Sequence, residues 1–150
     1  MKIYADTSFL VPLYIATDAW HAQALAIHQT WTTPPRLPLT PFGILELRNV
    51  LARMQHKGKM HMGDARQCEQ LIKQDLKDGI LEKCPLRAYE WMQTAMEVVD
   101  NVSPLTGTRT LDAMHLAIAR LHGADTLLSF DKNQRLAAKA AGFALMPTSI

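Results

Sequence analysis

Short apolar segments alternate with longer amphipathic segments along the whole chain, and this alternation constrains the fold more than any other feature. The apolar segments are the expected strands, and they cover residues 2–5, 37–40, 80–83, 126–130 and 143–146. The segments between them carry apolar residues at helical spacing. Strands that alternate with helices are typical of a parallel sheet covered by helices on both faces. The pattern therefore predicts an α/β fold, with one domain spanning residues 1–150.

The helical segments begin and end at residues that commonly cap helices. The first helix begins at Asp6–Ser8 and runs to Tyr14, and Thr17–Asp18 is the expected N-cap of a second helix that runs to Trp31. The remaining helices are expected over residues 42–57, 64–77, 88–102, 110–122 and 131–141. A loop is expected over residues 103–108. The helix 110–122 is apolar on nearly every side, which predicts a central, buried position.

Composition sets broad limits on the class of protein. Hydrophobic residues make up 48% of the chain, which is enough for a packed core. Lys and Arg number 16 against 14 acids, so the net charge of +2 neither requires nor excludes a nucleic-acid partner. Cys68 and Cys84 form no metal-binding or disulfide pattern and are expected to be reduced thiols. The chain shows no signal peptide and no apolar run near the roughly 20 residues of a membrane helix, so we expect a cytoplasmic protein.

Two acids stand directly after expected strands, where open α/β sheets bind ligands. Asp6 follows the first strand, and Asp131 follows the fourth. Each has a simpler interpretation as the N-cap of the next helix. Asp112 is harder to explain structurally, because a carboxylate on so apolar a helix costs free energy unless it is paired or bound to a metal. His115, on the same helix, is expected to be a packed core side chain and not a ligand.

Glu46 is a fourth candidate, on the helix expected over residues 42–57. Asn49, Arg53 and Lys57 follow it at three, seven and eleven residues, so they share its face. A solvated polar face is one interpretation. The other is a carboxylate beside a cationic track that follows a phosphate backbone.

Four acids in one site would suit metal-dependent phosphodiester cleavage. Mg²⁺ and Mn²⁺ prefer oxygen ligands, and they activate water and offset charge on the leaving oxygen. Four neighbouring carboxylates would repel one another without a cation. Thr7 and Ser8 are placed to orient Asp6 or a water on the metal from behind the ligands. The candidate metal ligands are therefore Asp6, Glu46, Asp112 and Asp131.

These motifs resemble those of PIN-domain nucleases. Their opening motif is similar to Asp6-Thr7-Ser8. The helix that carries their third acid is similar to residues 109–117 (RTLDAMHLA), and the strand end that carries their fourth acid is similar to residues 127–131 (LLSFD). Glu46 falls where the second acid belongs. The order, spacing and length are similar to those of VapC-type toxins. The resemblance implies a three-layer α/β/α domain with a central parallel sheet, RNA cleavage with Mg²⁺ or Mn²⁺ held by the four acids, a homodimer, and inhibition by a VapB-type antitoxin.

Three other functions stay open at the level of sequence. The first is a PIN nuclease that is not a toxin, and the second is a non-catalytic PIN-like binding module, although no acid is missing. The third is an α/β phosphoryl-transfer protein, either a receiver or an aspartyl phosphatase. The phosphatase would need an Asp where Ser8 stands, and the receiver would need an acceptor Asp near Thr40.

Overall fold

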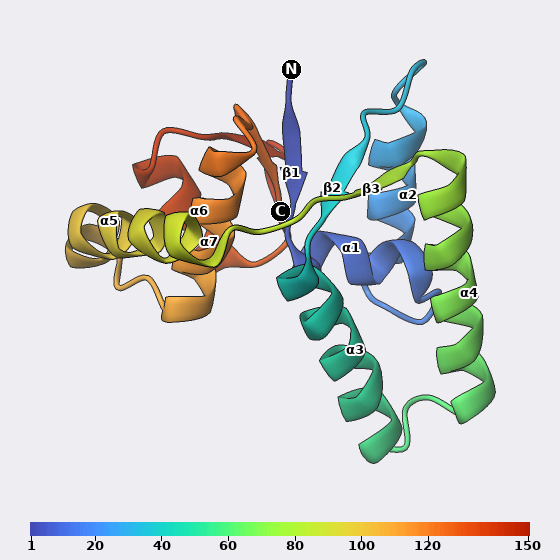
Figure 1. Ribbon diagram of the computed structural model, residues 1–150. Coiled ribbons are helices and arrows are strands. Elements are labelled where there is room, and N and C mark those ends of the chain that lie inside the picture. The colour runs from blue at the N-terminus through green and yellow to red at the C-terminus, as the bar shows by residue number, and fades with distance from the viewer. The chain divides into compact units, whose positions relative to one another are not determined.

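The computed structural model describes residues 1–150 and contains five strands and seven helices (Figure 1). The strands are β1 (Ile3–Ala5), β2 (Leu37–Leu39), β3 (Leu81–Lys83), β4 (Thr126–Leu128) and β5 (Ala144–Met146). The helices are α1 (Thr7–Tyr14), α2 (His21–Gln29), α3 (Pro41–His56), α4 (Met62–Asp78), α5 (Ala88–Thr106), α6 (Thr110–Leu121) and α7 (Lys132–Ala140). Contacts group the chain into two compact units, which we call the terminal unit (Met1–Ser8 and Pro85–Ile150) and the middle unit (Phe9–Cys84).

The terminal unit is built on a three-stranded parallel sheet with the order β1-β4-β5. Ala5 pairs with Leu128, and Leu128 pairs with Met146, so the three strands end level with one another. The residues that follow β1 and β4 therefore emerge at the same edge of the sheet. This is the register that brings Asp6 and the segment around Asp131 together.

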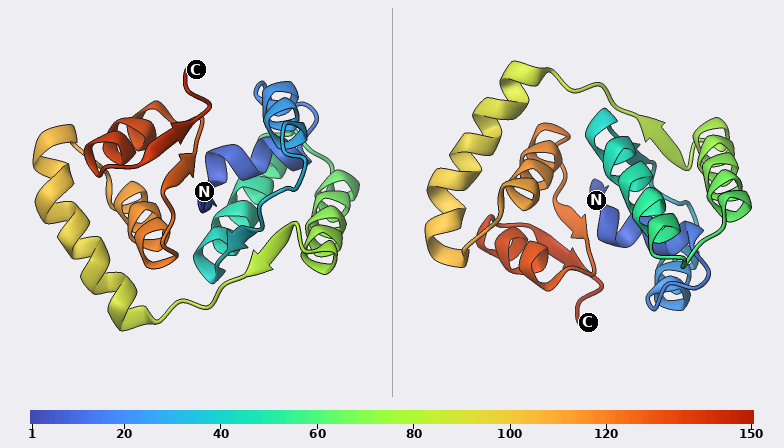
Figure 2. Two further views of the ribbon diagram at one scale, coloured as in Figure 1. Left: turned by 90° about the horizontal axis from the view of Figure 1, so that it is seen from above. Right: turned by 90° about the horizontal axis from the view of Figure 1, so that it is seen from below.

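Helix α6 lies between α5 and strand β1 in the terminal unit, as Figure 2 shows. The indole nitrogen of Trp91 on α5 donates to the carbonyl oxygen of Met114 at 3.2 Å. On the other side of α6, the ring Nδ1 of His115 lies 2.7 Å from the hydroxyl of Tyr4. The side chains from Leu116 to Ala119 are buried, which confirms the central position predicted for this helix. His115 is a buried, hydrogen-bonded core residue, as predicted.

The middle unit pairs β2 with β3 in parallel, with Leu39 opposite Lys83. Thr40 caps α3 by accepting a hydrogen bond from the backbone N–H of Gly43, so the helix begins at Pro41. Helix α4 begins at Met62, two residues before the expected start, because Asp64 accepts the backbone N–H of His61 in a capping box. Gly79 ends α4 in the left-handed conformation.

The second helix was predicted to begin near Asp18, and this prediction is wrong. Asp18 forms a turn, in which its carboxylate accepts the backbone N–H of Trp20 and its carbonyl oxygen accepts that of His21. The second bond spans three residues and not the four of an α-helix, so the helix starts only at His21. It ends at Gln29, which leaves Trp31 outside it, with its ring in edge contact with that of His28.

The loop predicted over residues 103–108 is also largely wrong, because α5 continues to Thr106. Pro104 suggested a break, since it has no N–H to donate to the preceding turn. Two contacts nevertheless complete the last turn. The hydroxyl of Thr106 donates to the carbonyl of Val102 at 2.9 Å, and Gly107, with a φ of 67°, donates its N–H to Ser103 at 2.8 Å.

Strand β4 ends at Leu128, two residues before the predicted end at Phe130. The backbone N–H groups of Phe130 and Asp131 donate to the side-chain oxygen of Ser8, at 2.9 and 3.1 Å, and so leave the strand ladder. The other strands are each a residue shorter than predicted. Every strand pair is parallel, which confirms the predicted α/β class with parallel strands. None of the helices combines the length and apolar character that crossing a membrane requires.

Candidate active site

Asp6 lies at the carboxyl end of β1, and its side chain is almost fully buried at 3% exposure. Its backbone N–H donates to the carbonyl of Leu128 at 3.1 Å, which continues the pairing of β1 with β4. One carboxylate oxygen accepts the hydroxyl proton of Ser8 at 2.6 Å. A short bond from a hydroxyl to a charged oxygen holds the carboxylate in one orientation.

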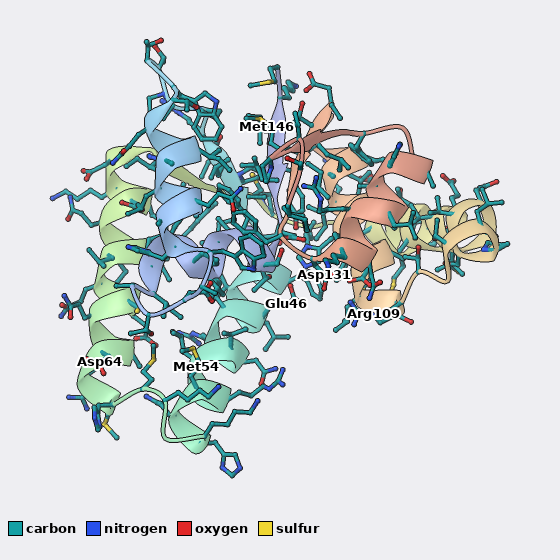
Figure 3. All side chains as sticks on the ribbon, turned by 180° about the vertical axis from the view of Figure 1, so that it is seen from behind. Glu46, Met54, Asp64, Arg109, Asp131 and Met146 are labelled. Atoms are coloured by element: carbon teal, nitrogen blue, oxygen red, sulfur yellow. The ribbon has the colours of Figure 1, made fainter.

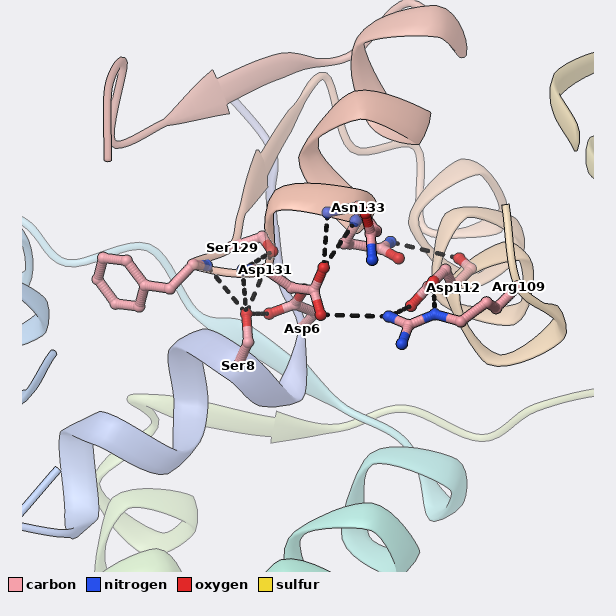
Figure 4. Close-up of polar contacts among 9 residues, drawn as sticks. Asp6, Ser8, Arg109, Asp112, Ser129, Asp131 and Asn133 are labelled. Atoms are coloured by element: carbon pink, nitrogen blue, oxygen red, sulfur yellow. Dashed lines mark hydrogen bonds and ion pairs between the residues drawn. The ribbon is translucent and has the colours of Figure 1, made fainter. Parts of the chain in front are cut away.

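Ser8 links β1 to the end of β4 through a single hydroxyl. Its proton is directed to Asp6, while its oxygen accepts the backbone N–H groups of Phe130 and Asp131 and lies 3.1 Å from the hydroxyl of Ser129 (Figure 4). The expectation that Ser8 would orient Asp6 agrees with this geometry. Ser129 was not singled out from the sequence, although its position two residues before Asp131 was the available signal. Thr7 is the first residue of α1.

Asp131 is the N-cap of α7. Its interpretation as a helix cap is therefore correct, but it accounts for only one of the two carboxylate oxygens. Its Oδ1 accepts the backbone N–H groups of Asn133 at 2.7 Å and Gln134 at 3.0 Å. Its Oδ2 takes no part in the cap and instead lies 3.2 Å from a guanidinium nitrogen of Arg109. The cap fixes the rotamer, and it leaves the second oxygen available for a cation.

Asp112 is in the first turn of α6 and is 8% exposed. The Nε of Arg109 donates to its Oδ2 at 2.8 Å, and a second guanidinium nitrogen lies 3.4 Å from its Oδ1. Arg109 therefore bridges Asp112 and Asp131, as Figure 4 shows. The hydrogen bond to Asp112, followed by the charges of both acids, raises the pKa of Arg109, so the guanidinium stays protonated.

Arg109 and Arg135 are the two site cations that the sequence reasoning missed. Arg109 stands three residues before Asp112, a spacing at which side chains of a helix meet. Arg135 is buried on α7, and it donates to the carbonyl oxygens of Ser129 at 3.1 Å and Thr148 at 3.3 Å. Burial lowers the pKa of Arg135, and the negative charge of Asp6 opposes that shift. Its place four residues after Asp131 was the only signal in the sequence.

Glu46 belongs to the middle unit, where it lies half-buried in the first half of α3 (Figure 3). Asn49, Arg53 and Lys57 follow it along the helix and its C-cap, and all three are exposed. Neither Arg53 nor Lys57 takes part in a salt bridge. The structure therefore gathers Asp6, Asp112 and Asp131 in the terminal unit, and it places Glu46 beside exposed cations in the middle unit.

The chemistry of the carboxylates fits a hard divalent cation. All the ligand atoms that these side chains offer are oxygens. Asp112 and Asp131 already face the same positively charged group, the guanidinium of Arg109. The structure contains no group of three or more His, Cys, Asp or Glu side chains arranged to hold a metal ion. The guanidinium of Arg109 supplies the positive charge between these two acids. A metal ion bound by them would have to share the space with Arg109 or displace it.

A sequence model of one protein family, described as PIN domain, matches residues 3–140. The chain belongs to the PIN domain family. The predicted resemblance is therefore confirmed, and with it the three-layer α/β/α fold class of PIN domains with a central parallel sheet. Membership of this family also removes the receiver and aspartyl phosphatase from consideration. No curated protein sequence matches the chain.

Solved structures of this fold include proteins of low sequence identity. VapC20 of Mycobacterium tuberculosis, described as a sarcin–ricin loop cleaving toxin, is 22% identical, with a TM-score of 0.69 over 95% of this PIN domain and 97% of VapC20. FitAcB from Neisseria gonorrhoeae is 14% identical, with a TM-score of 0.62 over 97% of each chain. PAE2754 from Pyrobaculum aerophilum is 19% identical, with a TM-score of 0.58 over 99% of this chain and 91% of that one.

Proposed function

We propose that this PIN domain is a metal-dependent endoribonuclease that acts as the toxin of a toxin–antitoxin pair. One observation carries the proposal. Asp6, Asp112 and Asp131 come from three separate segments, yet they are joined in one network through Ser8 and Arg109 at the carboxyl ends of β1 and β4. Structural helix caps alone do not require such a network.

In this proposal, Mg²⁺ or Mn²⁺ is held by four acids, Asp6, Glu46, Asp112 and Asp131. We also propose that the two units together form a single domain over residues 1–150. When bound, the cation activates a water for attack on phosphorus and offsets charge on the leaving oxygen. The chain's own residues prepare the site. Ser8 orients Asp6 through its 2.6 Å hydrogen bond, and the cap of α7 fixes Asp131 with one oxygen turned towards Arg109.

The toxin role is supported by the resemblance of the motifs to VapC-type toxins and by the fold shared with VapC20. It implies a cytoplasmic homodimer and a VapB-type antitoxin as partner. VapC20 is described as cleaving the sarcin–ricin loop, and for this chain we propose RNA as the class of substrate. A PIN nuclease outside toxin–antitoxin pairs and a non-catalytic PIN-like module are the alternatives that the following test separates.

The direct test is cleavage of structured and single-stranded RNA by the purified chain, with Mg²⁺, with Mn²⁺ and with EDTA. We expect cleavage with either metal, loss of cleavage in EDTA, and recovery when excess metal is added back. Full activity in EDTA would reject the metal mechanism. No cleavage of any RNA by folded, metal-loaded protein would favour the binding module.

We propose that Asn49, Arg53 and Lys57 form the track along which RNA binds on α3. Arg53→Ala and Lys57→Ala should each weaken binding of single-stranded RNA, and each should reduce the slope of log affinity against log salt by about 0.7, because one phosphate contact is lost. Fluorescence anisotropy over a salt series measures both effects. Arg120→Ala and Lys139→Ala, which remove exposed cations of the terminal unit, serve as controls. An equal change in the controls would assign the effect to net charge.

A further inference from the structure

A groove with an apolar floor runs along one face of α4 in the middle unit. Two adjoining cavities make it up, with volumes of about 460 Å³ and 200 Å³. Lys73, Leu76 and Lys83 line both cavities, so the two form one continuous surface. A single face of α4 lies along the groove, because the lining residues of this helix recur at helical spacing: Glu69, Ile72, Lys73 and Leu76.

The floor of the smaller cavity is made by leucine and isoleucine side chains, whereas Leu76 and Leu81 are the apolar side chains that line the larger one. Leu39 from β2 and Leu47 and Leu51 from α3 are buried beneath the smaller cavity, while Ile72 and Leu76 of α4 are half-buried along its side. Leu39 and Lys83 are the paired last residues of β2 and β3, so the smaller cavity sits at the carboxyl ends of these parallel strands. An occupant that presents apolar side chains would bury this surface.

The rim of the groove is strongly basic. Its cations are Arg36, Arg48, Lys73, Lys77 and Lys83, and none of them forms a salt bridge. Only two carboxylates line the groove, Glu69 and Glu82. Two further acids near the end of α4 lie outside the lining, where Asp75 accepts the hydroxyl of Tyr14 and Asp78 accepts the side-chain amide of Gln74. Within the lining, five cations face two carboxylates, which leaves an excess of positive charge along the groove.

We propose that this groove binds an acidic amphipathic peptide segment of a partner protein. Apolar side chains of the segment would lie on the leucine and isoleucine floor, and its Asp and Glu side chains would pair with the cations of the rim. The apolar floor favours a peptide over RNA, because a phosphate backbone would meet the cations but leave the floor uncovered. The proposal goes beyond the nuclease function and needs neither metal nor RNA cleavage.

Binding is tested with the full chain and a fluorescein-labelled helical peptide of about 15 residues, in which Leu recurs every three to four positions and Glu fills the flanks. One matched peptide has the same composition with its Leu residues grouped at one end, and another has Lys in place of Glu. Anisotropy titrations measure the dissociation constants. A single-stranded RNA of similar length is titrated separately and as a competitor.

The decisive variant is Lys73→Glu with Lys83→Glu, which reverses the two charges shared by both cavities. Lys132→Glu with Lys139→Glu makes the same change in net charge on exposed positions of α7. We expect the Leu–Glu peptide to bind saturably, and the groove variant to weaken it about tenfold while the α7 variant does not. Circular dichroism melting confirms that both variants are folded.

Three results would overturn the proposal. They are a lack of saturable binding by the Leu–Glu peptide, equally tight binding of the grouped peptide, and an equal loss of affinity in both charge variants. RNA that displaced the peptide and depended more strongly on Lys73 and Lys83 would make the groove a nucleic-acid surface instead. Because no cleavage is measured, an inactive nuclease would leave the peptide result unaffected, and the two proposals fail separately.

Discussion

Asp6→Asn and Asp112→Asn should each lower the rate of RNA cleavage by about 10³-fold, because each removes a negatively charged oxygen from the proposed metal site. The fold should survive. An asparagine at position 6 keeps an oxygen that accepts the proton of Ser8. At position 112 the group that loses its charged partner is Arg109, whose side chain is 61% exposed, so water solvates the guanidinium.

Single-turnover cleavage with saturating Mg²⁺ measures this effect, and Asp100→Asn on the exposed side of α5 is the matched control. If the toxin role is correct, expression of the wild-type chain should arrest growth, and Asp6→Asn should relieve the arrest. Normal cleavage by either variant would remove that acid from the catalytic set. Unfolding of both variants would instead make Asp6 and Asp112 structural residues.

The positions of the acids at the sheet edge were predictable because parallel strands end level with one another. Asp6 and Asp131 were placed after strands from the sequence alone, and the register of β1 with β4 brings those strand ends together. From the sequence, Asp131 had two alternative interpretations, as a helix N-cap and as a metal ligand. In the structure the two carboxylate oxygens of Asp131 have different contacts: one caps α7 and the other faces Arg109.

Side-chain contacts that cross between segments were beyond prediction. The hydroxyl of Ser8 binds the backbone after β4 across more than a hundred residues of sequence, and this contact shortens the strand. No periodicity carries that information. The same holds at the end of α5, where the bond from Thr106 to Val102 extends a helix that Pro104 was expected to end. Local propensity is a weak guide wherever a few polar contacts decide the outcome.

Arg109 shows a different limit of sequence reasoning. Its spacing from Asp112 was visible, and it lies within the motif that resembles PIN domains, but its contact with Asp131 depends on how α6 and α7 pack. Arg109 is the N-cap residue of α6, in an extended backbone conformation. Its long side chain is largely exposed and is held only by the two carboxylates. We therefore expect it to move away when a divalent cation binds the two acids.

Arg109→Gln should raise the affinity of the metal-free protein for Mn²⁺ by about three- to tenfold. A guanidinium brings one positive charge to Asp112 and Asp131, and a divalent cation that binds them must first lose or share that contact. Glutamine keeps much of the side chain and removes the competing charge. The affinity is measured by calorimetry or by the electron paramagnetic resonance of free Mn²⁺, in the absence of RNA.

Arg87→Gln is a closely matched control for this measurement. Arg87 is the N-cap residue of α5 and forms an exposed salt bridge with Glu90 three residues later, at 3.1 Å, but neither residue belongs to the candidate site. The control makes the same change in net charge, so an equal gain in both variants would assign the effect to long-range electrostatics. A weaker affinity in Arg109→Gln alone would mean that the guanidinium organises the two carboxylates for the metal. A gain confined to Arg109→Gln would identify this arginine as the internal cation that the metal displaces.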